Sequence, residues 1–163
     1  MLKIIPAKTK GDIQQIKLLF EEYAALLDFD LSFQNFEEEL ANLPGDYALP
    51  EGCLLLAWWD DQIAGCVALR KINQDCCEMK RLYVRPQFRR LEIGKTLARE
   101  IIEEAKKIGY TWMRLDTVPS MKRARALYES LGFKRIPPYR HNPIAGAVFL
   151  ELKLSPSVRL PNS

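Results

Sequence analysis

The most informative stretch of the chain is residues 84–95, which read VRPQFRRLEIGK. Strand-forming residues precede it, and apolar residues recur at helical spacing over residues 93–108. We therefore expect a loop that leads from a strand into a helix. The N–H groups of a first helical turn lack partners inside the helix and favour a bound anion. Basic side chains surround this helix start: Arg85, Arg89, Arg90 and Lys95. The stretch predicts a phosphate site, although a solvated basic loop has the same composition.

Charge is divided unevenly along the 163 residues. The formal net charge is +3, but residues 1–79 carry 6 Lys+Arg against 14 Asp+Glu, whereas residues 80–135 carry 15 against 6. With 48% hydrophobic and 28% charged residues, the composition excludes the disordered and fibrous classes and indicates a soluble globular protein. The basic block therefore indicates an anionic partner.

Outside this stretch, strands and helices alternate in an order typical of one mixed domain. Alternation and strand-forming residues predict strands at residues 2–6, 53–59, 62–70, 75–84, 110–117 and 146–154. Helical periodicity predicts helices at residues 12–27, 33–43, 93–108 and 121–131. We expect Asp12 and Ser32 to cap the first two helices, and Asp60-Asp61 to form a hairpin turn.

A second block accompanies the loop. Residues 78–97 read EMKRLYVRPQFRRLEIGKTL, and residues 114–133 read RLDTVPSMKRARALYESLGF. Together they resemble the GCN5-related N-acetyltransferase (GNAT) superfamily, in particular its small bacterial-type members. The family's loop pattern [QR]-x-x-G-x-[GA] is matched by residues 89–94. Its helix pattern A-x-x-L-Y-x-x-x-G-F is matched by Ala124, Leu127, Tyr128, Gly132 and Phe133.

The resemblance covers nearly all of residues 1–154 and implies the GNAT fold, of the α/β (α+β) class. That fold has a central, mostly antiparallel twisted sheet of six to seven strands, with about four helices on both faces. We expect a single N-acetyltransferase domain over residues 1–154, followed by a frayed C-terminal tail at residues 155–163.

The resemblance also implies acetyl-CoA as cosubstrate, with no metal. The residues assigned to the coenzyme by this resemblance are Leu82, Tyr83, Val84, Arg89, Arg90, Leu91, Glu92, Ile93, Gly94, Lys95 and Tyr128. A backbone N–H near residues 82–84 is the expected donor to the thioester oxygen.

Two positions depart from the family pattern. Glu92 stands where the family usually has its first loop glycine, and Met121 stands where many relatives have an asparagine. A carboxylate near the pyrophosphate adds bulk and like charge, unless the side chain points outward and complements the helix dipole. We favour the outward orientation and expect Glu92→Gly to leave acetyl-CoA affinity unchanged or improved.

The resemblance implies transfer of the acetyl group to a primary amine of a small molecule or peptide, by direct attack in a ternary complex. An alkyl ammonium must lose a proton before it attacks, and Glu78 is the first choice for the base. Its alternative role is to pair with Lys80 or an arginine, and His141 is an alternative base. Tyr128 matches the family tyrosine that protonates the leaving thiolate; its alternative role is a partly buried aromatic.

Acceptor contacts are expected from residues 23–38 and 137–146, which wall the acceptor pocket in the family. The candidates are Tyr23, Tyr139, His141 and Asn142. Acidic residues such as Asp28 and Asp30 favour a cationic amine, whereas Arg140 favours a carboxylate, as in an amino acid.

Other classes stay open. A coenzyme A-binding protein of the same fold without efficient catalysis is the main alternative, because of Glu92. The basic block shows no nucleic-acid-binding signature, so we expect no nucleic acid partner.

The four cysteines contain no CxxC pair and His141 is the only histidine, which argues against a zinc site and favours small buried thiols. The longest apolar run, residues 53–59, is too short to cross a bilayer, so we expect a cytoplasmic protein without a membrane partner. The family resemblance adds a homodimer as an open alternative to the monomer.

Overall fold

We describe residues 1–154 from a computed structural model; the tail predicted at residues 155–163 lies outside the described residues. Seven strands form one sheet in the order β1-β2-β3-β4-β5-β7-β6. Their bounds are β1 Leu2–Pro6, β2 Cys53–Trp59, β3 Gln62–Lys71, β4 Cys76–Val84, β5 Trp112–Thr117, β6 Lys134–Ile136 and β7 Val148–Lys153. Neighbouring strands are antiparallel except β4 and β5, which are parallel.

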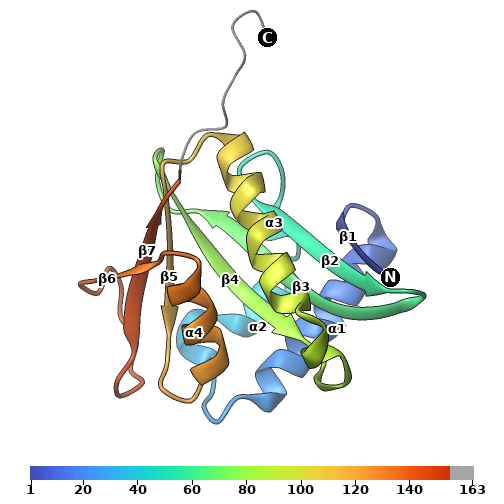
Figure 1. The fold of residues 1–163 in the computed structure, drawn as a ribbon, viewed down its shortest axis with the longest axis horizontal. Helices are drawn as coiled ribbons and strands as arrows, with labels where there is room; N and C mark the ends of the chain where they lie inside the picture. The colour runs from blue at the N-terminus through green and yellow to red at the C-terminus, as the bar shows by residue number, and fades with distance from the viewer. Residues whose placement is uncertain (155–163) are drawn as a thin grey trace, which may run out of the picture.

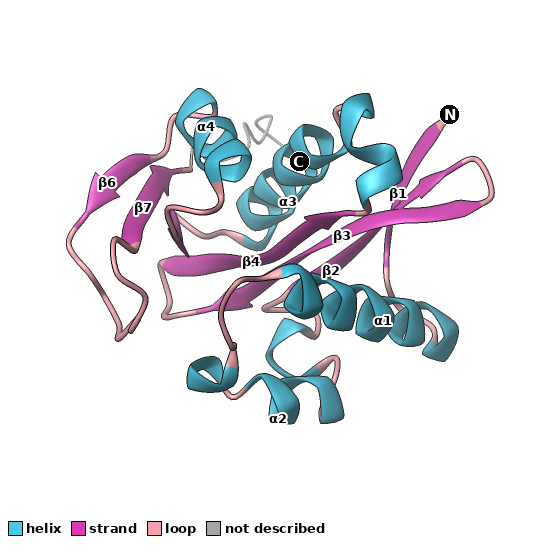
Figure 2. Ribbon diagram, turned by 90° about the horizontal axis from the view of Figure 1, so that it is seen from below, coloured by secondary structure: helices cyan, strands magenta, loops and turns pink. Residues whose placement is uncertain are grey.

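Four α-helices cover the two faces of the sheet. They are α1 (Lys10–Leu26), α2 (Phe36–Ala41), α3 (Ile93–Ile108) and α4 (Lys122–Ser130). Helices α3 and α4 lie on one face, and α1 and α2 lie on the other (Figures 1 and 2). Short 3₁₀ turns occur at Ser32–Gln34, Gly45–Tyr47 and Pro86–Leu91. The predicted mixed α and β fold, with a mostly antiparallel sheet between helices, is confirmed.

The core consists of two apolar layers, one on each face of the sheet. Leu97 and Ile101 of α3 pack against one face, and Ile16 and Phe20 of α1 pack against the other. Strand β2 contributes to both layers with alternate residues, which explains why its sequence is apolar throughout.

Several local expectations were wrong. The N-cap of α1 is Thr9, and Asp12 is the third helical residue, whose carboxylate accepts from the Thr9 backbone N–H in a capping box. The predicted second helix is divided, because Asn35 adopts a left-handed conformation between a 3₁₀ turn and α2, and Ser32 makes no cap. Strand β6 was missed because three residues show no measurable alternation.

Strand β4 contains an irregularity that shapes the molecule. Ala68 of β3 pairs with Lys80 and Cys66 pairs with Tyr83, so that two residues of β4 oppose one residue of β3. Arg81 lies in this β-bulge with φ of 60°, a conformation that is uncommon for a residue with a side chain. Because the bulge shifts the alternation, the side chains of Lys80 and Arg81 reach the same residue, Gln34.

Strands β4 and β5 pair over only three residues each. Cys76 to Glu78 pair with Trp112 to Arg114, and beyond this point the two strands separate (Figure 1). The C-terminal half of β4 therefore has no hydrogen-bonded strand on the side of β5.

A substitution at Gly65 of β3 tests how closely β3 approaches the bulged strand β4. A Cβ atom at this position would lie 2.4 Å from the Tyr83 carbonyl oxygen, which is backbone and cannot swing away. We predict that Gly65→Ala lowers the free energy of unfolding by about 1–3 kcal/mol, as overpacking does, measured by denaturant titration. The matched control is Gly11→Ala in the first turn of α1, where the nearest atom is 3.8 Å away; it should raise stability by about 0.4–1 kcal/mol. Equal stability of the two variants would contradict this account of the bulge.

Candidate active site

A cavity of about 650 Å³ lies beside the end of β4. Its walls come from the end of β4, the start of α3, the start of α4 and the end of α1. The predicted coenzyme residues that line it are Leu82, Tyr83, Val84, Arg89, Glu92, Gly94 and Lys95. Arg90 and Leu91 are exposed outside it, and Ile93 is buried in the core beneath α3. The predicted loop and strand end therefore meet around one space.

Four cations line this cavity without a carboxylate partner in the described part of the chain. They are Arg89, Lys95, Lys122 and Arg123. Arg85, by contrast, binds the Glu22 carboxylate of α1 at 2.7 Å and 3.0 Å and does not line the cavity. Sequence reasoning did not assign Lys122 and Arg123 to the coenzyme, because only the fold brings the start of α4 next to the loop.

The first turn of α3 has backbone N–H groups that can bind an anionic group. The first internal bond of the helix runs from the Thr96 N–H to the Glu92 carbonyl, so the preceding three N–H groups are free of helical partners. Gly94 lies among them and lines the cavity, and a Cβ there would contact only Val84, at 3.6 Å. The space beside this helical turn is therefore open to a phosphate of a ligand.

Glu92 precedes this turn with φ of 56° and makes no capping hydrogen bond. Its backbone is in the left-handed region that favours glycine, which gives a structural reason for the glycine of the family pattern. The side chain is exposed and lines the cavity.

A smaller cavity of about 60 Å³ adjoins the larger one. Both cavities are lined by Tyr23, Leu82, Met121 and Ala124. The smaller one is lined in addition by polar residues from several elements, including Gln34, Lys80, Arg81, Asp116, Tyr128 and Asn142. The fold thus brings Tyr23, Tyr128 and Asn142 to one cavity. Neither Tyr139 nor His141 lines either cavity, and His141 is exposed.

Tyr128 is 8% exposed and packs edge-on against Phe133, with ring centroids 5.7 Å apart. Burial, with smaller contributions from Tyr23 and Asp116, raises the pKa of Tyr128 well above its usual value. The phenol therefore carries its proton at neutral pH, which is the form from which an acid must start. Burial also raises the pKa of Tyr23 to about 12.

Glu78 is fully buried and held by three side chains. Its carboxylate accepts from Arg70 Nε at 2.8 Å and from the Tyr139 hydroxyl at 2.6 Å, and it pairs with Arg140 Nη2 at 2.6 Å. Arg70 lies directly opposite Glu78 on β3. The carboxylate lines neither cavity. This is the geometry of the ion-pair alternative, with Arg70 and Arg140 as the partners.

Asp116 was not singled out from the sequence. It lies near the end of β5, lines the smaller cavity, and accepts from Arg140 Nη2 at 2.7 Å and from Asn142 Nδ2 at 2.9 Å. The available signal was its position, because polar residues at the C-terminal ends of central parallel strands meet at one edge of a sheet.

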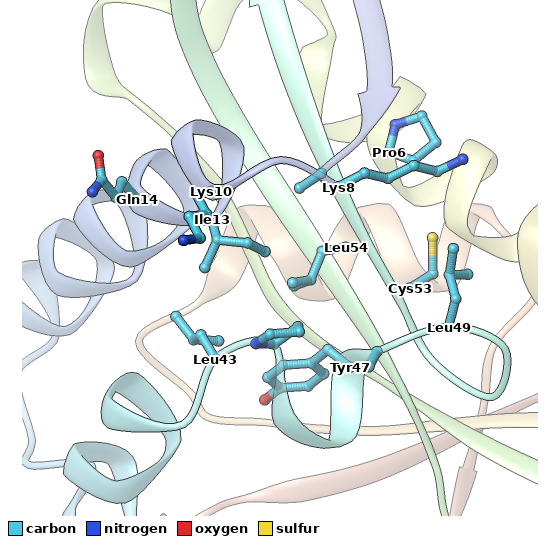
Figure 3. Close-up of a pocket in the computed structure, with 13 residues that line it drawn as sticks. Pro6, Lys8, Lys10, Ile13, Gln14, Leu43, Tyr47, Leu49, Cys53 and Leu54 are labelled. Atoms are coloured by element: carbon cyan, nitrogen blue, oxygen red, sulfur yellow. The ribbon is translucent and has the colours of Figure 1, made fainter.

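A third cavity, of about 560 Å³, lies away from both motifs. It is enclosed by the end of β1, the start of α1 and the segment before β2, and Pro6, Ile13, Leu43 and Leu54 give it an apolar lining (Figure 3). None of the residues assigned to coenzyme or acceptor lines it.

The four cysteines are free and buried, as predicted. Burial raises the pKa of Cys53 and of Cys76 to about 11. Among residues 1–154, no cluster of three or more His, Cys, Asp or Glu side chains forms a metal site. No helix in that range has the length and apolar character needed to span a membrane.

Known proteins are similar to this chain in sequence. The acetyltransferase (GNAT) family matches residues 16–133. An uncharacterized N-acetyltransferase of Schizosaccharomyces pombe is 43% identical over 156 residues, covering 94% of this chain and 96% of that protein.

Solved structures show the same fold. An acetyltransferase from Streptococcus agalactiae superposes with a TM-score of 0.76 at 20% identity, covering 94% of this chain and 98% of the other. A GNAT family acetyltransferase from Elizabethkingia anophelis, with acetyl-CoA bound, superposes with a TM-score of 0.67 at 22% identity, covering 94% and 98%. The chain belongs to the acetyltransferase (GNAT) family and is an acetyl-CoA-dependent acyltransferase.

Proposed function

We propose that this enzyme transfers the acetyl group of acetyl-CoA to a primary amine of a small molecule or peptide, in a ternary complex at the junction of the two cavities. The observation that carries the proposal is that a cation-lined cavity and a small polar cavity share four wall residues, with Tyr128 on the wall of the smaller one. A long anionic thioester and an amine would meet at such a junction.

Acetyl-CoA, when bound, supplies an acetyl group activated as a thioester. The free N–H groups before Thr96, with Arg89 and Lys95, would hold its pyrophosphate. Lys122 and Arg123 of α4 would bind its remaining phosphate. The β4 backbone at residues 82–84, which has no sheet partner on the side of β5, would bind the pantetheine arm and orient a donor toward the thioester oxygen.

Tyr128 is the proposed acid. As the C–N bond forms and the C–S bond breaks, negative charge gathers on sulfur, and the phenol donates its proton there. Its place on the wall of the smaller cavity, beside the junction, supports this role.

Glu78 is the proposed base for the amine proton, and its surroundings restrict how it acts. Its carboxylate is paired with Arg70 and Arg140, so both oxygens are engaged by arginines. Because neither its carboxylate nor Tyr139 lines a cavity, the amine proton would have to reach Glu78 through water.

The competing interpretation is a coenzyme A-binding protein without efficient catalysis. A thiol-release assay with polyamines, amino acids and peptides bearing free N-termini or lysines separates the two. Acetyl-CoA binding by calorimetry, without amine-dependent thiol release for any member, would overturn the proposal.

We predict that Tyr128→Phe lowers kcat about 100-fold, because the thiolate leaves without an acid, while the Kd for CoA changes little. Tyr110→Phe is the matched control: it removes a phenol that donates to the Glu51 carbonyl at 2.6 Å, away from both cavities. The control should lose stability and keep its kcat. Unchanged turnover in Tyr128→Phe would remove the acid role.

For Glu92→Gly, we predict a rise in the free energy of unfolding of up to about 1 kcal/mol, because glycine relieves a left-handed residue. Acetyl-CoA should bind equally well or more tightly. Glu92→Gln separates the two effects, because it removes the charge and keeps the Cβ. A large loss of affinity in the glycine variant, measured by calorimetry, would assign Glu92 a positive role in binding.

Glu78→Gln should reduce kcat about 100-fold if Glu78 is the base. The variant should also lose about 1–3 kcal/mol of stability, because the half-buried Arg70 loses its carboxylate partner, whereas Arg140 keeps Asp116. Arg70→Met is the comparison, since it disturbs the same ion pairs and keeps the carboxylate. If Glu78 is the base, kcat falls only in Glu78→Gln when both variants are measured at a temperature where they are folded. If kcat is equal in the two variants, Glu78 acts only as an ion-pair partner.

A further inference from the structure

Lys80 is a buried cation without an anionic partner. It is 7% exposed, and its Nζ donates to the neutral Gln34 Oε1 at 2.9 Å. Within residues 1–154 no carboxylate lies within ion-pairing distance of it. A buried ammonium is unfavourable unless an anion compensates it, and it has three N–H donors. The Lys80 ammonium therefore has unused capacity for an anion.

The neighbouring arginines are already paired. Arg81 binds both oxygens of Glu39 at 2.9 Å and donates to Gln34 at 2.8 Å. Arg140, the sequence-based candidate for a carboxylate contact, is bound to Glu78 and Asp116. Among the described cations that line the smaller cavity, Lys80 is thus the one whose charge is not neutralised.

A carboxylate lies on another wall of the same cavity. Asp116 accepts two hydrogen bonds, from Arg140 and Asn142, and a carboxylate has about four acceptor sites. Its charge contributes to the raised pKa of both Tyr128 and Tyr23, which places it near the phenol proposed as the acid. A cavity of about 60 Å³ therefore has an unpaired ammonium on one wall and a carboxylate on another.

We propose that the acceptor is a free amino acid, whose carboxylate binds Lys80 and whose amino group faces Asp116. This inference rests on the proposed function and narrows its acceptor class. A polyamine would place a second ammonium against Lys80, and a peptide N-terminus has an amide where the carboxylate is required. A zwitterionic amino acid presents a carboxylate to Lys80 and an ammonium group to Asp116.

Lys80 also links this binding to proton uptake. Burial, and next the charge of Arg81, are the main causes that lower the pKa of Lys80 to about 7; Glu78 opposes them, and Arg140 and Arg70 contribute less in the same direction as Arg81. Asp116, Tyr23 and Tyr128 face the same cavity. A bound carboxylate favours the ammonium form, so the amino acid should bring a proton with it at and above pH 7.

The test is calorimetric titration of the protein, saturated with CoA, with each of the twenty common amino acids and its carboxamide. At least one amino acid should bind about tenfold or more tightly than its carboxamide, because the amide removes a charge-assisted contact. Its binding heat should vary with buffer ionisation enthalpy, showing proton uptake at pH 7.5. Lys80→Met should lose both effects and unfold at the same or a higher denaturant concentration, because a buried charge is removed.

The control is Lys17→Met on the exposed face of α1, which should keep both effects. The inference is overturned if no amino acid binds better than its carboxamide, or if the preference survives in Lys80→Met. If Lys80→Met loses acetyl transfer to all amines equally and still prefers the amino acid to its carboxamide, the inference is overturned and Lys80 acts as a base instead. If an amino acid binds through its carboxylate but no thiol is released, the proposed function alone is overturned. If acetyl transfer occurs equally to amines with and without a carboxylate, only this inference is overturned.

Discussion

The separation of β4 from β5 is the constraint on which the site depends. Their parallel pairing ends after Glu78 and Arg114, and the bulge at Arg81 follows immediately on β4. The end of β4 therefore has no sheet partner on the side of β5, where both cavities form. The bulge directs two consecutive basic side chains, Lys80 and Arg81, to the same residue, Gln34. A strained backbone conformation is tolerated because β3 holds the strand on its other side.

The charge division of the sequence has two structural meanings. Carboxylates of the acidic half neutralise cations of the central strands and the loop after β4: Glu22 pairs with Arg85, Glu39 with Arg81 and Glu78 with Arg70. The described cations that line the cavities without such partners are those for which we propose anionic ligands. The basic block is therefore partly internal counter-charge and partly the proposed binding surface for coenzyme and acceptor.

The sequence predicted the fold because local signals agreed along the chain. The helical period over residues 93–108 marked α3, and that over residues 121–131 marked α4. Side-chain partners could not be predicted, because they depend on register: Arg70 meets Glu78 only through the pairing of β3 with β4. The bulge at Arg81 leaves no signal in a period-2 pattern, so the exposure and partners of Lys80 were equally hidden.

A crystal structure with CoA bound tests the central claim most directly. The account predicts a pantetheine arm hydrogen-bonded to the backbone of residues 82–84, with the pyrophosphate at the first turn of α3 and the thiol near Tyr128. It also predicts that β4 and β5 remain apart beyond Glu78. Coenzyme bound elsewhere, such as in the apolar cavity beside α1, or the two strands paired along their length, would contradict the account.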